Sequence, residues 1–372
     1  MSIDLTLYAL GDLGPRRSDP HSIFDQCRST LKQADLVFAQ LEPCLSNRGT
    51  PAPQARLAMR TDPVAAQAIK AAGIDVVSWA SNHCMDWGRD AFADTLHNLA
   101  ENKIAMVGAG QTIQLARQPY IKIINDNRIA MLAYCSILPQ GYWATEDCPG
   151  CAPMRAVTVN EQIEHDQPGT PMRQHTFPQR EDMLALLADI QSVKKQADVV
   201  LVSFHWGLHF IPVQIADYQQ QIAHAAIDAG ADIIVGHHPH ILKGIEIYRD
   251  APIFYSLGNF AIESPSAFKA GLQESDSFHE IKSLNKNWLQ KDRLLLPVDS
   301  LKTCIAKFEL SAGKVQRVGL IPCYINEDAQ PEVLNNKDDK FLEVVSYLQQ
   351  ITEAAQLNAR LQVIDNEVWV TC

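Results

Sequence analysis

Three histidines lie within four residues of one another, just after the apolar, β-branched stretch 233–235. They are His237, His238 and His240. Turns favour Gly, Asn, Asp and Ser for their backbone freedom, whereas histidine brings a titratable nitrogen that binds metal ions. A buried strand that ends here would deliver three imidazoles to one place. The pattern therefore predicts a metal site at this strand end.

Four further apolar stretches end at or beside a side chain that can bind a metal ion. These side chains are Asp12, Glu42, Asn82 and His205. Ligands gather at the carboxyl ends of strands in open α/β sheets, so we expect all of these residues to share one site with the three histidines. Carboxylate, imidazole and amide groups together suit divalent ions such as Mn, Fe, Zn or Co.

The residues of this set differ in the chemistry that they offer. Glu42 is expected to bridge two cations, an arrangement that lowers the pKa of a bound water. His83 follows Asn82 directly and is then free to act as an acid or a base. Each residue alone also has a simpler interpretation, since Asp12 could cap a turn and a lone His205 could be a core histidine. Their joint placement at strand ends favours the shared site.

The elements that must position these side chains alternate between strands and helices. Asp62-Pro63 is a typical helix start and Gly73 a typical helix end. We expect helices at 64–72, 89–101, 181–196, 217–229 and 340–357, and strands at 3–10, 36–41, 74–79, 104–108, 120–124, 129–136, 198–204, 233–235, 252–257, 303–310 and 314–321, with two short strands after residue 357. This alternation predicts an α/β fold.

Two long stretches, 138–180 and 263–298, are polar and irregular in sequence. They are expected to lack regular elements and to shape the pocket, because stretches of this length are typical of lids and binding loops. We treat them as insertions in one domain that spans residues 1–330. Residues 331–372 are expected to pack on the same domain as a helix with short strands.

The composition limits the partners of the protein. The formal charge of −11 over 372 residues argues against nucleic acid or an anionic membrane surface as the main partner. The first residues do not have the pattern of a leader and no apolar run reaches the ~18 residues of a membrane span, so neither a leader nor a span is expected. The nine scattered cysteines fit reduced thiols. The expected location is the cytoplasm. Cys148 and Cys151 are interpreted as part of a turn.

Other enzyme signatures are missing from the sequence. No G-x-S-x-G, P-loop or H-E-x-x-H motif occurs. The remaining histidines do not follow predicted strands and are interpreted as surface or packing residues; these are His21, His97, His165, His175, His209, His224 and His279.

Over about residues 5 to 325, the motifs resemble a known family in their order and spacing, the poly-γ-glutamate capsule-synthesis proteins of the CapA (PgsA) type. The resemblance is carried by Gly11-Asp12, Leu41-Glu42-Pro43, Ser81 to Gly88, Gly108 to Gly110, Ser203 to Gly207, Gly236 to His240 and Tyr255 to Phe260. This family looks like a branch of the calcineurin-like metallophosphoesterases. The resemblance implies a four-layered α-β-β-α sandwich around a dinuclear metal centre.

The resemblance also assigns roles to residues. It implies that His83 is the acid for the leaving group and that the metal ligands are Asp12, Glu42, Asn82, His205, His238 and His240. His237 is counted with the catalytic residues, and the resemblance leaves its assignment open: a group that supports the ligands, a group that meets the substrate or, after a shift of one residue, a ligand. Two departures put ordinary phosphoesterase activity in question. Gly14 stands where metallophosphoesterases usually have a histidine, and Glu42 stands where they usually have an aspartate.

Three functions follow as hypotheses. The first is a metal-dependent enzyme, a hydrolase that activates water on one or two divalent ions and acts on a small-molecule, γ-glutamyl or peptide substrate. The second is a non-hydrolytic protein that binds or assembles polyglutamate with a degraded metal site. The third is a peptide-modifying enzyme of the epimerase kind, which would abstract a proton next to a carbonyl.

Overall fold

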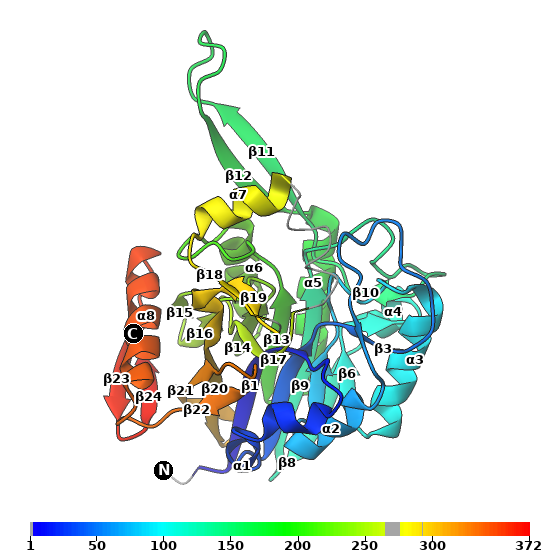
Figure 1. Cartoon of the computed structure of the whole chain (residues 1–372), viewed down its shortest axis with the longest axis vertical. Helices are drawn as coiled ribbons and strands as arrows, with labels where there is room; N and C mark the ends of the chain where they lie inside the picture. Colours follow the sequence, from blue (N-terminus) through cyan, green and yellow to red (C-terminus); the bar gives the residue numbers. More distant parts are fainter. Residues whose placement is uncertain (1–2, 265–275, 292) are drawn as a thin grey trace.

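Two β-sheets lie face to face in the computed structural model, which describes residues 3–264, 276–291 and 293–372 (Figure 1). The first sheet has the strand order β23-β24-β21-β20-β1-β2-β5-β6, with β17 beside β1 and β22 beside β21. Its strands are β1 (Leu5–Gly14), β2 (Leu36–Leu41), β5 (Val76–Ser78), β6 (Ala105–Val107), β17 (Asn259–Ile262), β20 (Lys302–Ser311), β21 (Lys314–Ile325), β22 (Pro331–Val333), β23 (Arg360–Ile364) and β24 (Glu367–Thr371).

The second sheet has the order β15-β16-β14-β13-β9-β8. Its strands are β8 (Tyr120–Ile124), β9 (Asn127–Cys135), β13 (Val199–His205), β14 (Ile233–His237), β15 (Ile245–Tyr248) and β16 (Ala251–Phe254). The central pairs of both sheets are parallel, β1 with β2, β2 with β5, β13 with β14 and β13 with β9. Parallel strands end at the same edge of their sheet, so each sheet has one edge where several carboxyl ends meet.

Alternate residues of each strand face different layers. Leu201 and Val235 belong to the large buried cluster that also contains Leu7 and Phe38 of the first sheet. Their neighbours Val202 and Ile234 point to the other face. The large cluster therefore fills the space between the two sheets. Since it also contains the consecutive β2 residues Val37 and Phe38, it extends to the outer face of the first sheet. The second sheet has a further core on its outer side.

Helices cover the outer faces of both sheets. α2 (Ala65–Ala72) and α3 (Gly88–Glu101) contribute buried residues to the main cluster, and α5 (Arg180–Lys194) and α6 (Asp217–Asp228) contribute to the outer core of the second sheet. α8 (Asp339–Ala354) packs on β21, and β24 pairs with β21. The expected four-layer α-β-β-α architecture is confirmed.

The remaining elements are short. They are the 3-10 helices η1 (Pro20–Phe24) and η4 (Val298–Leu301), the helices α1 (Arg28–Leu31) and α4 (Ile113–Ala116), and the two-residue strands β3 (Cys44–Leu45), β4 (Arg60–Thr61), β7 (Ala109–Gly110) and β10 (Gly150–Cys151). Within the described ranges, no helix is both long and apolar enough to cross a membrane.

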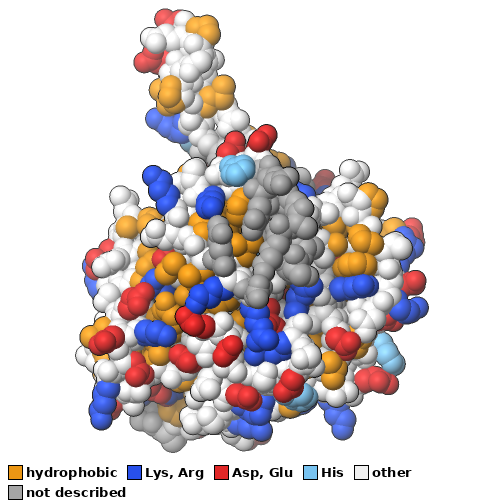
Figure 2. Space-filling model, in the orientation of Figure 1, with side chains coloured by type: hydrophobic (Ala, Val, Ile, Leu, Met, Phe, Trp, Pro, Cys, Tyr) orange, Lys and Arg blue, Asp and Glu red, His pale blue; other side chains and the backbone are white. Residues whose placement is uncertain are grey.

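The expectation that 138–180 lacks regular elements is wrong. This stretch contains a hairpin of β11 (Ala156–Gln162) and β12 (Met172–Pro178), which projects from the body (Figure 1). Hydrophobic side chains are visible on it in Figure 2, and Val159 and Phe177 are among the exposed ones. Because no buried face imposes the usual alternation of apolar and polar residues, the sequence pattern was too weak to show these strands.

The second insertion also contains elements that the sequence pattern did not show. They are α7 (Asp276–Leu284), β18 (Trp288–Gln290) and β19 (Leu295–Pro297). The part of the prediction that concerns residues 265–275 and 292 lies outside the described residues. All nine cysteines are free thiols, and Cys148 contacts Arg89 while Cys151 is buried 3.2 Å from the sulfur of Cys84.

Candidate metal centre

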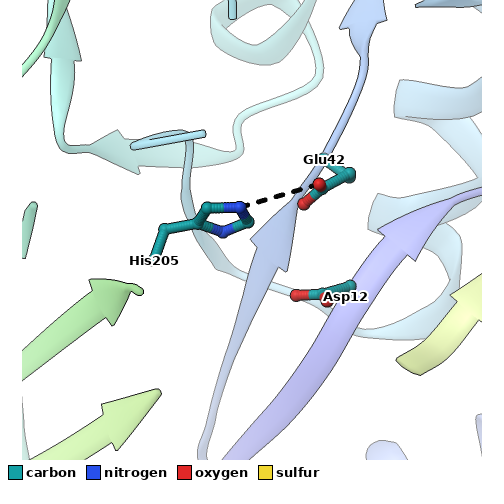
Figure 3. A group of neighbouring side chains, drawn as sticks. All are labelled: Asp12, Glu42 and His205. Carbon is teal, nitrogen blue, oxygen red and sulfur yellow. Dashed lines mark ion pairs between the residues drawn. The ribbon is translucent and has the colours of Figure 1, made fainter. Parts of the chain in front are cut away.

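Three strand ends from both sheets bring their side chains to one buried point (Figure 3). Asp12 lies in β1, Glu42 follows β2, and His205 is the last residue of β13. One potential ligand atom from each residue lies within 4.8 Å of the others. Nε2 of His205 is 3.7 Å from Oε1 of Glu42, and all three side chains are fully buried.

The histidine cluster closes this point from the end of β14. Nδ1 of His237 is 3.5 Å from Oδ1 of Asp12, and Nδ1 of His240 is 3.2 Å from Oδ2 of the same carboxylate. The ring of His238 stands edge-on to that of His205 at 4.9 Å. His238 and His240 have φ of 94° and 57°, in the left-handed region that side chains other than glycine seldom adopt. Such strain concentrates at functional sites.

Asn82 and His83 approach from the loop after β5. The amide oxygen of Asn82 is 2.7 Å from Nε2 of His205. Nδ1 of His83 is 2.6 Å from Oδ2 of Asp86, and its Nε2 is 3.7 Å from Oε1 of Glu42. Asp86 is itself fixed, because it accepts hydrogen bonds from the Tyr142 hydroxyl at 2.8 Å and from a backbone amide. The ring of His83 is therefore oriented with Nε2 toward the carboxylates.

The structure thus brings together all eight residues that the sequence singled out. Two more residues belong to the same place. Asn259, in the predicted Tyr255 to Phe260 motif, has its amide oxygen 2.8 Å from Nδ1 of His240. His209 stacks on His238 with ring centroids 4.0 Å apart and lines the cavity above. Sequence reasoning passed over His209, although it lies only four residues after the predicted ligand His205.

Both oxygens of Asp12 and both oxygens of Glu42 are buried and make no hydrogen bond among the described residues. Burial of an unpaired carboxylate is costly, and such groups are normally paired or bound to a metal ion. The ring nitrogens Nδ1 of His205 and of His238 are also without a hydrogen bond in the part of the chain that the structure describes. Two carboxylates and two imidazoles with unused lone pairs fit a divalent cation.

The protonation states suit the same role. Burial lowers the pKa of His205 and of His238 well below the usual value, so both rings are neutral and have a lone pair for a metal ion. Burial acts to raise the pKa of Asp12, but the imidazole rings of His237 and His240 beside its carboxylate outweigh burial and the pKa falls. Asp12 is therefore ionised. Burial, reinforced by the charge of Asp12, raises the pKa of Glu42 to about 7.

The histidine ligand that metallophosphoesterases usually have after the first aspartate has no counterpart here. A Cβ at Gly14 would lie 2.9 Å from Cγ1 of Ile262 and 3.4 Å from Pro43. The space for a side chain at this position is thus filled by Ile262. The backbone is also closely packed at Gly236, where a Cβ would lie 2.2 Å from the carbonyl oxygen of Tyr255. That contact explains the glycine before the histidine cluster.

A cavity of about 290 Å³ lies above these residues. Three of the predicted ligands, Asn82, His238 and His240, line it, and Asp12, Glu42 and His205 lie fully buried beside them. We call these six residues the floor. The rest of its lining includes the polar residues Gln54, Arg56, Glu263 and Ser264. We call wall the apolar residues Phe210, Ile262, Phe278, Trp288, Leu295 and Leu296. The second insertion supplies four of these wall residues. From the first insertion, residues 138–180, only Pro139 is among the described residues that line the cavity.

The four layers and the site together define the class of this protein. It is an α-β-β-α protein with a buried cluster of carboxylates and histidines that can hold a metal ion. The chain belongs to the family described as bacterial capsule synthesis protein PGA_cap, whose model matches residues 6–264. The predicted family is therefore confirmed.

Two curated relatives have names that agree with this family. The chain is 31% identical over 245 residues to the "PGA biosynthesis protein CapA" of Bacillus subtilis, which covers 65% of this chain and 57% of that protein. It is 32% identical over 197 residues to the "Capsule biosynthesis protein CapA" of Bacillus anthracis, with 53% and 42% covered. The chain thus spans about half the length of the curated relatives that it matches.

Among solved structures, the chain is similar to the calcineurin-like phosphoesterase YfkN from Bacillus subtilis. The TM-score is 0.38 at 12% identity, with 95% of this chain and 99% of that chain covered. The layers and strand order described above define the architecture of this protein.

Proposed function

We propose that this protein is a metal-dependent hydrolase of the capsule-synthesis family. Its ligands for one or two divalent ions, Mn, Zn, Co or Fe, are Asp12, Glu42, Asn82, His205, His238 and His240. The observation that supports this proposal most is the burial of four carboxylate oxygens, on Asp12 and Glu42, without a hydrogen bond. A bound divalent ion would lower the pKa of water and polarise the bond to be cleaved.

The protein's own groups have distinct tasks in this proposal. Asp12 and Glu42 supply negative charge from two adjacent strands of the first sheet. His205 and His238 supply neutral imidazoles from the second sheet and the loop that follows it. Asn82 supplies an amide oxygen that already lies 2.7 Å from His205. Because each of the two sheets contributes ligands, the site depends on the packing of the sheets against each other.

His83 is the proposed acid for the leaving group. Burial acts to lower its pKa, but the charge of Asp86 and its hydrogen bond to Nδ1 outweigh burial and raise the pKa. The raised pKa favours the protonated ring, in which Nε2 carries a proton on the side of the floor and the cavity. A protonated imidazole in this position can give that proton to a departing oxygen or nitrogen.

His237 fits a supporting role better than a ligand role. It contacts Asp12 through Nδ1, 3.5 Å from Oδ1 of that carboxylate, and is fully buried. We propose that it orients the Asp12 carboxylate and does not meet the substrate.

The experiment begins with the metal. The purified protein is treated with chelator, its residual metal is measured, and it is reloaded with Mn, Zn or Co. Phosphoesters and γ-glutamyl amides are then screened as substrates. We expect tight binding of at least one ion, turnover that depends on it, and a His83→Ala variant that keeps the metal and loses activity. A protein that retains no metal and turns nothing over would contradict the proposal.

The two alternative functions make different predictions. A polyglutamate-binding protein would bind γ-glutamyl oligomers without metal and without turnover, and an epimerase would exchange solvent deuterium into a peptide. The names of the curated relatives support a role for this protein in poly-γ-glutamate or capsule biosynthesis. A cytoplasmic location also stays a proposal, supported by the free cysteines. Fractionation of cells that produce the protein would test it.

A further inference from the structure

The wall of the cavity forms a continuous series of aromatic rings that begins at the floor. The ring of Phe210 lies 5.6 Å from that of His240. Trp288 stands edge-on to Phe210 at 5.2 Å and to Phe278 at 5.2 Å. Edge-to-face pairs at such distances stabilise one another and hold their rings in fixed orientations. The wall is therefore a formed surface next to the proposed metal site.

The wall is separate from the cores that hold the layers together. Phe210 and Leu296 belong to a third, small hydrophobic cluster, against which Trp288 and Ile281 pack. Neither of the two large clusters between the layers includes them. Since these side chains contribute little to the packing of the sheets, their apolar character is explained better by what the cavity receives.

The charges around the cavity do not suit a chain of glutamates. Arg56 is the one Lys or Arg side chain among the described residues that line it. Glu263, which also lines it, is paired with Arg17 at 3.2 Å and with Arg293 at 3.4 Å. A site for a polyanion needs several cations on its surface. Within the described residues, the wall itself offers no cation to the carboxylates of a polyglutamate.

We propose that the substrate carries an apolar group of about the size of an aromatic ring, next to the group that reacts at the floor. The apolar group packs against Phe210, Trp288 and Phe278, and the polar group meets the floor. The identity of the reacting group rests on the proposed function above. The preference for an apolar group depends on the wall alone and holds with or without metal.

Matched pairs of small probes test the preference directly. Benzamide and acetamide are titrated into metal-free protein, and phenylacetate, acetate and tri-γ-glutamate into manganese-loaded protein, by ligand-observed NMR or calorimetry. Burial of a phenyl ring is expected to tighten binding roughly tenfold to hundredfold within each pair. Tri-γ-glutamate is expected to bind more weakly than phenylacetate.

Variants of the cavity lining test whether the preference for phenyl probes arises there. Trp288→Ala and Ile281→Ala each remove part of the cavity lining, from β18 and from α7, and each is expected to reduce the preference for the phenyl probe several-fold. Phe177→Ala is the matched control, because this aromatic side chain is exposed on the projecting hairpin and does not line the cavity. It is expected to leave the preference unchanged.

The outcomes separate this proposal from the previous one. If the phenyl probes bind preferentially and the wall variants lose the preference, the wall proposal is supported, even where no metal-dependent hydrolysis is found. If both members of each pair bind equally, or if tri-γ-glutamate binds at least as tightly as phenylacetate, the wall proposal is overturned even in a protein that hydrolyses its substrates with metal. Loss of the preference in Phe177→Ala would also overturn it.

Discussion

The floor and the wall of the cavity are built in opposite ways. The floor consists of polar side chains that leave the ends of five strands, held by the packing of two sheets, and its carboxylate oxygens lack hydrogen bonds among the described residues. The wall consists of apolar side chains, most of them from an insertion. The difference suggests that the framework of the fold sets the chemistry, whereas an insertion sets which molecule reaches it.

Removal of a floor carboxylate is expected to have the largest effect. Glu42→Gln keeps the size of the side chain but removes the charge that faces His205 and His83. We expect metal affinity to fall by at least a hundredfold and activity to be lost, while the fold persists. Metal analysis after dialysis measures the metal affinity, and circular dichroism checks that the fold persists. Retention of full metal content would contradict the assignment of Glu42 to the floor.

The same variant makes a prediction for the metal-free protein. Burial raises the pKa of Glu42 to about 7 from its ordinary 4.5, so the folded state binds the proton more tightly than the unfolded state. The wild type therefore loses stability as pH rises through this window, by roughly 1–3 kcal/mol. The Glu42→Gln variant does not lose stability in this way, because its amide does not ionise. We expect the variant to be more stable than the wild type above pH 7, measured by chemical denaturation in the presence of chelator.

The next largest effect concerns proton transfer at the edge of the floor. Asp86→Asn removes the carboxylate that orients His83 but not a predicted ligand. We expect kcat to fall ten- to a thousandfold with unchanged metal content, because general acid catalysis contributes about 10²–10⁴-fold. His83→Ala should cause at least as large a loss. If Asp86→Asn instead releases the metal, Asp86 acts on the ligands and not through His83.

The sequence was sufficient to predict the floor because strand ends carry a strong signal. The strand residues 199–204 and 233–236 are buried on both faces, and histidines of the site directly follow them. The wall could not be predicted in this way. Phe278 and Trp288 lie in a polar stretch, and their approach to Phe210 depends on how the insertion folds back over 68 to 78 residues of intervening chain. His209 was missed for the same reason, since it lies in a loop without periodicity.

Lys243 lies beneath the loop that follows His205, and an effect on stability alone, not on metal content or kcat, is expected there. It is buried and donates hydrogen bonds to the carbonyl oxygens of Ile211 and Gln214, in the loop that carries His209 and Phe210. Burial lowers its pKa from 10.5 to about 7, so the unfolded state binds the proton more tightly. Stability should therefore rise between pH 7 and pH 10 by roughly 2–4 kcal/mol.

Lys243→Met provides the comparison, because it keeps the length of the side chain without the charge. The stability of the variant should not rise between pH 7 and pH 10. The difference in unfolding free energy between wild type and variant should therefore change steadily over this pH range. Urea denaturation at several pH values measures it. Parallel pH profiles of the two proteins would show that the ammonium group is not buried in solution.

The smallest effect is expected from a change in the first insertion. The sequence analysis predicted that both insertions shape the pocket. The described hairpin residues do not line the cavity, and a two-stranded hairpin that projects alone adds little stability. We expect replacement of residues 161–173 by Asn-Gly to leave metal content, the thermal midpoint and the preference for phenyl probes nearly unchanged. The hairpin base, where Thr176 binds Asp217 and Tyr218, stays intact in this variant. A loss of activity or of the phenyl preference would mean that both insertions, and not the second alone, control access to the floor.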